Sequence, residues 1–202
     1  MHVEVITEEP SAGAVLSNLL PRMLPENSSF SILPFNDKDE LLRRIAGVLR
    51  GYAPWLLQDW HVVVLVDRNG DDCHKLKATL DEIALNAGLI PKSRSRTGHF
   101  HVLNRIAVEE LEAWFFGDVP ALRAAYPHVP ETLGEKASYR DPDLVKGGTW
   151  EQLARVLGYS PETFPKIEVA RRVSKHMDPA RNRSRSFQVF ASGIAELASG
   201  DA

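Results

Sequence analysis

The sequence predicts an α/β fold in which a mainly parallel sheet is flanked by helices. Along the first half of the chain, short β-prone runs alternate with segments whose apolar residues recur at helical spacing. Residues 62–66 form a continuous apolar run, largely β-branched, which is typical of a central strand covered on both faces. A β-α-β-α-β-α-β order favours parallel strands with helices on both sides of the sheet.

Each expected element follows from a local pattern. Caps are expected at Ser11 for the first helix and at Asp37 or Asp39 for the second, because their side-chain oxygens can accept free backbone N–H groups. Gly88 is expected to end the third helix. The expected strands cover residues 3–6, 30–35, 62–66 and 101–107, and the expected helices cover residues 12–23, 41–49 and 73–87.

The second half of the chain reads differently. Seven prolines between residues 120 and 179 divide it into short helices and loops, and no strand is predicted there. We therefore expect an α/β core over residues 1–117 and a helical extension over residues 118–202. The extension is expected to pack on the core, so that the two form one structural unit.

Composition excludes several classes of protein. Of the 202 residues, 44% are hydrophobic and 25% are charged, which are globular values and argue against wholesale disorder. The single cysteine, Cys73, excludes an intramolecular disulfide framework. No stretch approaches 18 uninterrupted apolar residues and no signal peptide is expected, so a cytoplasmic protein with no membrane contact is predicted. A net charge of −3 leaves only local patches to bind nucleic acid.

Acidic residues gather where an α/β sheet carries its chemistry. Glu8 and Glu9 follow the first expected strand, and residues 109–112 follow the fourth. The third strand ends at Asp67, which is followed by four polar residues and a glycine. Ligands of open parallel sheets bind beyond the carboxyl ends of the strands. Carboxylates brought together raise one another's pKa values, and a hard divalent cation such as Mg²⁺ resolves that conflict.

Each acid also has a purely structural interpretation. Asp71 or Asp72 could cap the third helix, and Asp67 could be a turn residue. The functional interpretation depends on their joint placement at one edge of the sheet. A calcium-binding EF-hand loop is excluded, because Gly70 comes two positions early and Ala78 stands where a bidentate glutamate is required.

Glu112 is the most informative single acid. If a helix runs through this segment, Glu112 falls within an apolar stripe with Val108, Leu111 and Phe115. A buried carboxylate must be paired, neutralised or bound to a metal. A salt bridge to an arginine such as Arg105 and a metal site are both consistent with this position, whereas Glu110 is expected to face solvent.

Two segments are locally basic. Residues 92–105 contain no acid, and residues 166–185 carry seven basic residues against two acidic ones. Such runs could bind phosphates of nucleic acid, or they could be solvated faces and partners for the acidic clusters. The residues assigned to a nucleic-acid interface on this basis are Arg94, Arg96, Arg172, Lys175 and Arg183.

Taken together, these motifs resemble the Toprim domain. More closely, the chain resembles a bacterial family that has a Toprim-like core and is described only as a domain of unknown function. The matching stretches are residues 8–12, 64–73, 105–114, 147–150, 176–179 and 182–187. Toprim domains of topoisomerases, primases and OLD-type nucleases use such acids to bind Mg²⁺ for phosphoryl transfer on nucleic acid.

The resemblance implies a role for each acid. Glu8 matches the first-strand glutamate, and Asp67 matches the first aspartate of the Asp-x-Asp motif. The second aspartate is Asn69 here, a weaker ligand, for which Asp71 could substitute. The metal ligands expected are Glu8, Asp67, Asn69, Asp71 and Glu109, for Mg²⁺ or Mn²⁺. Glu8, Asp67 and Glu112 are the expected catalytic residues, and either Glu109 or Glu112 would complete a second metal position or act as the base.

Two functions follow from this. The first is a Mg²⁺-dependent phosphoryl-transfer protein that acts on nucleic acid, most plausibly a nuclease. The alternative is a non-catalytic Toprim-like subunit that binds a protein partner, such as an ATPase in a bacterial defence system. Asn69 favours the alternative, because a neutral amide leaves the site one negative charge short.

Overall fold

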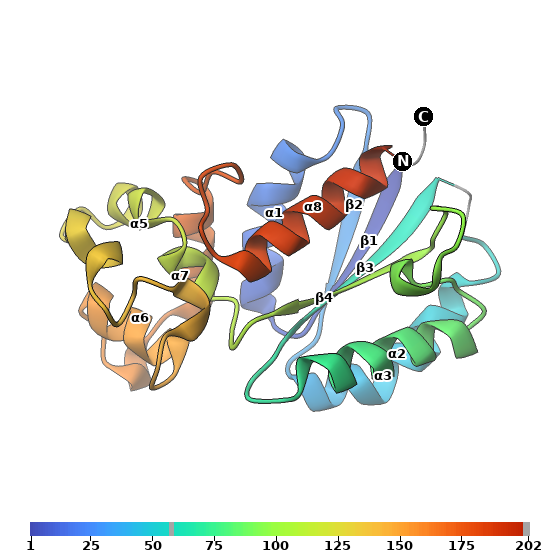
Figure 1. Ribbon diagram of the computed structural model, residues 1–202, viewed down its shortest axis with the longest axis horizontal. Helices are drawn as coiled ribbons and strands as arrows, with labels where there is room; N and C mark the ends of the chain where they lie inside the picture. Colours follow the sequence, from blue (N-terminus) through green and yellow to red (C-terminus); the bar gives the residue numbers. More distant parts are fainter. Residues whose placement is uncertain (57–58, 200–202) are drawn as a thin grey trace.

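The computed structural model describes residues 1–56 and 59–199 and contains one parallel sheet (Figure 1). Its strands lie in the order β2-β1-β3-β4, and every pairing between neighbours is parallel. The strands are β1 (His2–Thr7), β2 (Ser29–Pro34), β3 (Trp60–Asp67) and β4 (Val102–Ala107). The expected α/β class and all four strands are confirmed, with β4 one residue shorter than predicted.

Strand β3 is central because its sequence suits burial on both faces. Its residues His61–Asp67 are all buried, as expected for a continuous apolar run in a parallel sheet. It pairs with β1 on one side, where Thr7 lies opposite Leu65, and with β4 on the other. Strands β1 and β3 are therefore neighbours, and their carboxyl ends meet at the same edge.

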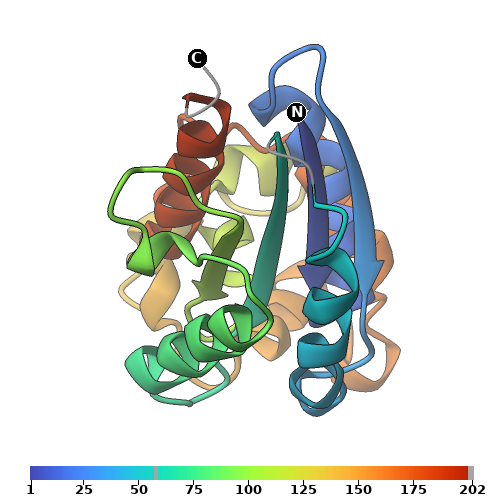
Figure 2. The ribbon, with the colours of Figure 1, turned by 90° about the vertical axis from the view of Figure 1, so that its right-hand side faces the viewer.

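Helices cover both faces of the sheet (Figure 2). Helices α2 (Lys38–Tyr52) and α3 (Cys73–Asn86) cover one face. Helices α1 (Pro10–Met23) and α8 (Arg185–Ser199) cover the other, so α8 returns to the sheet although it lies far along the chain. Each face has its own apolar core, and in both of them valines of β3 are packed.

The remaining helices form a lobe at the end of the sheet toward which β4 points (Figure 1). Aromatic residues Trp114–Phe116 connect the core under α1 and α8 directly to the apolar interior of the lobe. None of the helices described has the length and apolarity needed to cross a bilayer. The helices of the lobe are α4 (Ala113–Phe116), α5 (Val119–Ala125), α6 (Thr149–Leu157) and α7 (Lys166–Ser174), with 3₁₀ turns at Glu131–Glu135, Pro142–Leu144 and Pro161–Thr163.

Helix α7 lies along α1 and is fixed there by polar contacts. The Arg22 guanidinium donates to the carbonyl oxygens of Ser174, at 2.7 Å, and Met177, at 2.6 Å. The Asn18 amide donates to the carbonyl of Arg171. Since α1 begins at the carboxyl end of β1, this packing holds the first residue of α7, Lys166, at the same edge of the sheet.

The helix caps agree only partly with the prediction. Asp37 caps α2 by accepting the backbone N–H of Glu40, and Asp72, not Asp71, caps α3. Ser11 was expected to cap α1, but the helix begins at Pro10 and the Ser11 hydroxyl instead donates to the Glu9 carboxylate at 3.0 Å. Proline at the first helical position, which needs no N–H partner, places the start of the helix two residues earlier than expected.

Gly117 marks the tightest approach between the lobe and the segment that leads into α8. A Cβ there would run into the Asn182 carboxamide oxygen and lie 2.8 Å from the Ser184 nitrogen. We expect Gly117→Ala to destabilise the protein by about 1–3 kcal/mol, the usual cost of overpacking. A Cβ at Gly47 in α2 would meet no neighbour within 4 Å, so Gly47→Ala should instead stabilise by roughly 0.5–1 kcal/mol. Urea unfolding of the two variants tests the contrast, and equal stabilities would contradict it.

Candidate metal centre at the carboxyl ends of β1 and β3

Two neighbouring strands deliver buried carboxylates to one point. Glu8 directly follows β1, and its backbone N–H continues the ladder to Leu65 at 3.2 Å. Asp67 is the last residue of β3. Their exposed fractions are 5% and 6%. The predicted meeting of Glu8 and Asp67 at one sheet edge is therefore what the structure shows.

Hydrogen bonds fix the Glu8 carboxylate in place. One oxygen, Oε2, accepts the backbone N–H of Asp67 at 2.8 Å, and the other, Oε1, accepts from the Asn69 amide at 3.1 Å. Asn69 lies in the left-handed region, with φ 48°, a conformation that asparagine tolerates better than most residues. Asn69 thus orients Glu8, and its amide nitrogen, not its oxygen, faces the carboxylate in this structure.

Glu9 joins the same cluster. Carboxylate oxygens of Glu8, Glu9 and Asp67 all lie within 4.8 Å of one another. Glu9 also accepts from Ser11 and from the Lys166 ammonium, whose Nζ lies 3.3 and 3.2 Å from its two oxygens. We call Glu8, Glu9 and Asp67 the acidic cluster.

Glu112 is buried, with an exposed fraction of 2%, as predicted, but for a different reason. The segment 109–112 is not helical: Glu109 has φ 59°, and α4 begins only at Ala113. Of the two alternatives for Glu112, the salt bridge to Arg105 is wrong, because Glu112 Oε1 lies 3.8 Å from Lys166 Nζ, and Arg105 donates to carbonyl oxygens. The other oxygen, Oε2, has no hydrogen-bond partner among the described residues.

Burial dominates the electrostatics of the site. It raises the pKa of Asp67 well above the ordinary value, and the nearby carboxylates of Glu112, Glu8 and Glu9 raise it further. Burial raises the pKa of Glu112 to about 7 although Lys166 opposes the shift. Burial also raises the pKa of Glu8, although the hydrogen bond from the backbone N–H of Asp67 lowers it in part. The four carboxylates of Glu8, Glu9, Asp67 and Glu112 therefore outnumber the two ammonium groups, of Lys166 and Lys38, whose charges act on them.

Lys166 is the internal counter-ion of these acids. Burial lowers the pKa of this lysine, but the carboxylates of Glu112 and Glu9 outweigh burial and raise it above the ordinary value. The ammonium also lies 5.6 Å from the centre of the Trp150 ring, a favourable cation–π distance. Lys166 is therefore charged at neutral pH.

The other two predicted ligands lie apart from the cluster. Asp71 has a side chain that is 54% exposed and pairs with Lys38 at 2.9 Å. Glu109 forms an ion pair with Arg68. Both acids therefore already have cationic partners in direct contact, whereas the acidic cluster is contacted by Lys166 through Glu9, and Lys38 acts on Glu8 from a greater distance.

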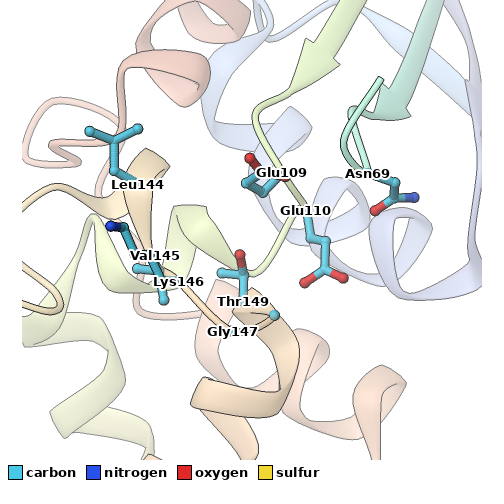
Figure 3. A pocket seen from close by; sticks show the side chains of 9 residues that line it. Asn69, Glu109, Glu110, Leu144, Val145, Lys146, Gly147 and Thr149 are labelled. Carbon is cyan, nitrogen blue, oxygen red and sulfur yellow. The ribbon is translucent and has the colours of Figure 1, made fainter. Parts of the chain in front are cut away.

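Glu110 is half-buried and not solvated as expected, because it caps helix α6. Its Oε2 accepts the backbone N–H of Trp150 at 2.8 Å, and burial raises the pKa of its carboxyl. Next to it is a cavity of about 630 Å³ whose lining includes Asn69, Lys146 and Thr149. Figure 3 shows Glu109 and Glu110 between Asn69 and the Leu144–Lys146 segment in this view. Through Asn69, this cavity adjoins the acidic cluster.

The basic residues assigned to nucleic acid fall in different places. Arg94 and Arg96 precede β4, in a loop at the amino ends of the strands, so they lie at the opposite end of the sheet from the acidic cluster (Figure 1). Arg94 pairs there with Glu82. The sequence run 92–105 could not reveal this, because it spans both a loop at one end of the sheet and the strand that leads to the other end.

The basic residues of the lobe are likewise spread out. Lys175 follows α7 and lies about 13 Å along the helix axis from Lys166, given the rise per residue of an α-helix. Arg172 stacks on Tyr126 at 4.5 Å. Arg183 lies against Gly134, beside a second, smaller hollow. The structure brings none of these three into contact with the acidic cluster.

Sequence reasoning missed two residues of the centre. Glu9 is not among the predicted ligands, although its place after β1 next to Glu8 was the available signal. Lys166 belongs to a basic run in the sequence, and nothing local distinguishes it from its neighbours. Its position depends on the packing of α7 on α1, which no short motif encodes.

Comparison with known proteins places the chain in a family. The family model described as Domain of unknown function (DUF4276) matches residues 7–195, nearly the whole chain. The chain belongs to the DUF4276 family. This confirms the resemblance to a domain of unknown function that the motifs indicated. A search of curated proteins found no match to this DUF4276 chain.

A solved structure shares the fold of this DUF4276 chain. It is the C-terminal region of the Xanthomonas campestris pv. campestris OLD protein, which aligns with a TM-score of 0.53 at 11% sequence identity. The alignment covers 98% of this chain and 96% of that one. At this identity the likeness concerns the fold alone, and it agrees with the expected parallel sheet flanked by helices.

The raised pKa values predict how stability depends on pH in the absence of divalent metal. A carboxyl whose folded pKa is raised contributes stability below its unfolded pKa, and this contribution is lost as pH rises through the folded pKa. For Glu112 that window runs from about 4.5 to about 7. Stability should therefore fall between roughly pH 5 and pH 8, and Glu112→Gln should remove on the order of 3 kcal/mol of this fall.

Urea unfolding in a chelator at several pH values measures this dependence. Glu26→Gln, at an exposed acid in the loop after α1, is the matched control and should keep the wild-type slope. Parallel curves for wild type and Glu112→Gln would show that Glu112 does not titrate in this range.

Proposed function

We propose that this protein is a divalent-cation-dependent phosphoryl-transfer enzyme acting on nucleic acid, most plausibly a nuclease. The observation that carries the proposal is the convergence of the acidic cluster at the carboxyl ends of two adjacent parallel strands, where such folds bind their ligands. The likeness in fold to the C-terminal region of an OLD protein, and the Toprim resemblance of the motifs, support the same assignment.

The chemistry of the donor set fits a hard cation such as Mg²⁺ or Mn²⁺. Glu8, Glu9 and Asp67 offer only carboxylate oxygens, which these ions prefer. Burial raises the pKa values of Glu8 and Asp67, and a cation bound between their carboxylates would favour the charged forms of both. The partnerless, buried Oε2 of Glu112 adds a further oxygen with no donor among the described residues. Glu8, Glu9 and Asp67 would hold the ion, which would supply Lewis-acid activation of a phosphodiester.

The protein's own residues would do the remaining work. Glu112, with a pKa of about 7, is balanced between its two protonation states near neutral pH and can hold or release a proton at Oε2. Lys166 contributes a fixed positive charge 3.8 Å from Glu112. Of the two acids that the sequence offered as the base, Glu112 is favoured, because Glu109 is occupied by Arg68. The Asn69 amide holds the orientation of Glu8.

A second candidate function has its own support. Lys166 already places a permanent cation between Glu9 and Glu112, and Asn69 replaces the second acid of the Toprim pattern. These two features would suit a Toprim-like subunit that has lost catalysis and binds a protein partner such as an ATPase. Metal binding and cleavage, measured separately, distinguish the two functions.

Metal binding should depend on Asp67. A cation present at a hundredfold excess over its Kd would stabilise the folded state by about 2.7 kcal/mol and raise Tm by several degrees. We expect Mg²⁺ or Mn²⁺ to produce such a shift in wild type and in Glu26→Gln, and no shift in Asp67→Asn. Differential scanning fluorimetry with each ion measures this. A shift that persists in Asp67→Asn would place the ion elsewhere.

Restoring the acid at Asn69 should have opposite effects without and with metal. Asn69→Asp loses the amide that donates to Glu8 and places a second carboxylate against it, so we expect a lower Tm in chelator. With Mn²⁺ the extra charge should tighten binding, so the metal-induced shift should exceed that of wild type. An unchanged Tm in chelator would contradict the role of Asn69 in orienting Glu8.

Cleavage is the decisive assay. Labelled single- and double-stranded DNA and RNA, incubated with Mg²⁺ or Mn²⁺, should be cut by wild type and not by Asp67→Ala. Asn69→Asp should cleave faster, and Glu112→Gln should cleave at least about tenfold more slowly if it transfers a proton. If the ion binds in an Asp67-dependent way but no substrate is cleaved, even by Asn69→Asp, the enzyme proposal is wrong and the non-catalytic subunit is the better interpretation.

A further inference from the structure

Thr149 carries a buried hydroxyl that the fold does not satisfy. It is the first residue of α6, its exposed fraction is 1%, and its Oγ1 has no hydrogen-bond partner among the described residues. Gly147 and Gly148 precede it with φ angles of 81° and 78°, a conformation that glycine adopts readily, and they turn the chain into the helix. Because an unpaired buried polar group destabilises a protein, this hydroxyl is not explained by the stability of the fold.

The Thr149 hydroxyl faces the cavity of about 630 Å³ that adjoins the acidic cluster. In Figure 3 its oxygen points toward Glu109, across the space between Glu110 and the Val145–Lys146 segment. The cavity has the size of a small-molecule site and is large enough for a nucleoside unit. Its lining comes from Asn69, from the loop after β4 and from residues 144–149. The cavity therefore lies between the sheet edge that holds the acidic cluster and the lobe.

The polar side chains around this cavity are mainly hydrogen-bond acceptors. The Asn69 amide nitrogen donates to Glu8, so its oxygen is directed elsewhere, and in Figure 3 this oxygen is turned toward Glu110. Glu110 contributes a carboxylate, of which one oxygen caps α6. Among the described lining residues, Lys146 is the one with a cationic side chain, and it is exposed. A ligand that fits this lining therefore brings hydrogen-bond donors.

Charged ligands fit the cavity less well. A phosphate would bind at the amino end of α6, but there the Glu110 carboxylate already accepts the backbone N–H of Trp150 and would repel an anion. A metal ion would favour several close carboxylates. The group of three found among the described residues is the acidic cluster, which includes neither Glu109 nor Glu110, and Glu109 is paired with Arg68. An uncharged group that carries hydroxyls meets neither difficulty.

We propose that this cavity binds a ribose of an RNA strand, whose 2′-hydroxyl pairs with Thr149 and Glu110, so that the protein selects RNA over DNA. Carboxylates that accept ribose hydroxyls are used in other nucleotide-binding α/β folds, and the 2′-hydroxyl is what distinguishes RNA from DNA. The inference rests on the proposed function: Asn69 contacts Glu8 and also lines the cavity, so the phosphodiester attached to a ribose bound there would lie beside the acidic cluster.

Binding is measured separately from cleavage. Short single-stranded oligonucleotides of one sequence are made as RNA, as DNA and as 2′-O-methyl RNA, and their Kd values are measured by fluorescence anisotropy in chelator. RNA should bind wild type at least about tenfold more tightly than the other two, because a site that pairs with a hydroxyl rejects analogues that lack the donor. Urea unfolding and circular dichroism of each variant described below establish that it is folded.

Thr149→Val removes the hydroxyl at nearly constant volume. We expect the Kd for RNA to rise toward the Kd for DNA, while the Kd for DNA stays unchanged. The variant should be at least as stable as wild type in urea, because the hydroxyl that it loses is unpaired. Thr132→Val is the matched control: Thr132 is an exposed threonine in the Glu131–Glu135 turn, and its replacement should keep the full preference for RNA.

Glu110→Gln distinguishes a ribose from a phosphate in the cavity. The amide keeps an oxygen for the N–H of Trp150 but replaces a carboxylate oxygen by a donor. RNA should therefore bind at least about threefold more weakly, with little change for DNA. At a phosphate site, loss of the negative charge would instead tighten the binding of RNA and DNA alike.

Several results would overturn the proposal. These are equal binding of RNA and DNA to wild type, a full preference for RNA in Thr149→Val, and tighter binding of both strands by Glu110→Gln. Displacement of the RNA by adenosine at lower concentrations than by unlabelled RNA would assign the cavity to a free nucleoside. A preference for RNA that depends on Thr149, without cleavage of any substrate, would keep the ribose site and refute the enzyme. Cleavage without a preference for RNA would do the reverse.

Discussion

The crowding of carboxylates at the ends of β1 and β3 is the constraint on which the site depends. Parallel pairing of these two strands brings Glu8 and Asp67 to one edge, where they are almost completely buried. Like charges in a buried place are costly without a cation. Lys166 places an ammonium among these acids, and burial raises the pKa values of Asp67 and Glu112, which favours their protonated forms. A divalent ion bound there would supply the positive charge that Lys166 provides only in part.

The helical lobe supplies the lysine that partly balances the charge of these carboxylates. Helix α7 packs along α1 and thereby delivers Lys166 to the acids that follow β1. The loop after β4 delivers Glu112 to the same ammonium from the other side. The lobe shares an apolar core with one face of the sheet, so the counter-ion is held by packing of large aromatic side chains such as Trp114 and Phe116. The position of this charge thus depends on the apolar core together with the polar contacts of Arg22 and Asn18 that hold α7 on α1.

The sheet could be predicted from the sequence because its signals are local. The run Val62–Val66 identifies a central strand, and the acids Glu8 and Asp67 directly follow or end strands, so their meeting requires only that these strands be adjacent. Glu112 was correctly expected to be buried, but the helix expected to contain it begins only at Ala113, and the ion-pair partner of Glu112 is Lys166, not Arg105. Glu112 and Lys166 are 54 residues apart in the sequence. Their contact depends on tertiary packing, which the local spacing of apolar residues does not indicate.

The short segment from Glu109 to Glu112 connects three parts of the molecule. Glu109 holds Arg68 of the loop after β3, Glu110 caps α6, and Glu112 contacts the first residue of α7. A ligand that draws Glu112 or Glu9 away from Lys166 therefore also removes a contact that anchors α7. By thermodynamic linkage, occupancy of the sheet edge and the seating of the lobe must influence each other to the same extent. A ligand bound at the acidic cluster would therefore alter how firmly α7 packs on α1.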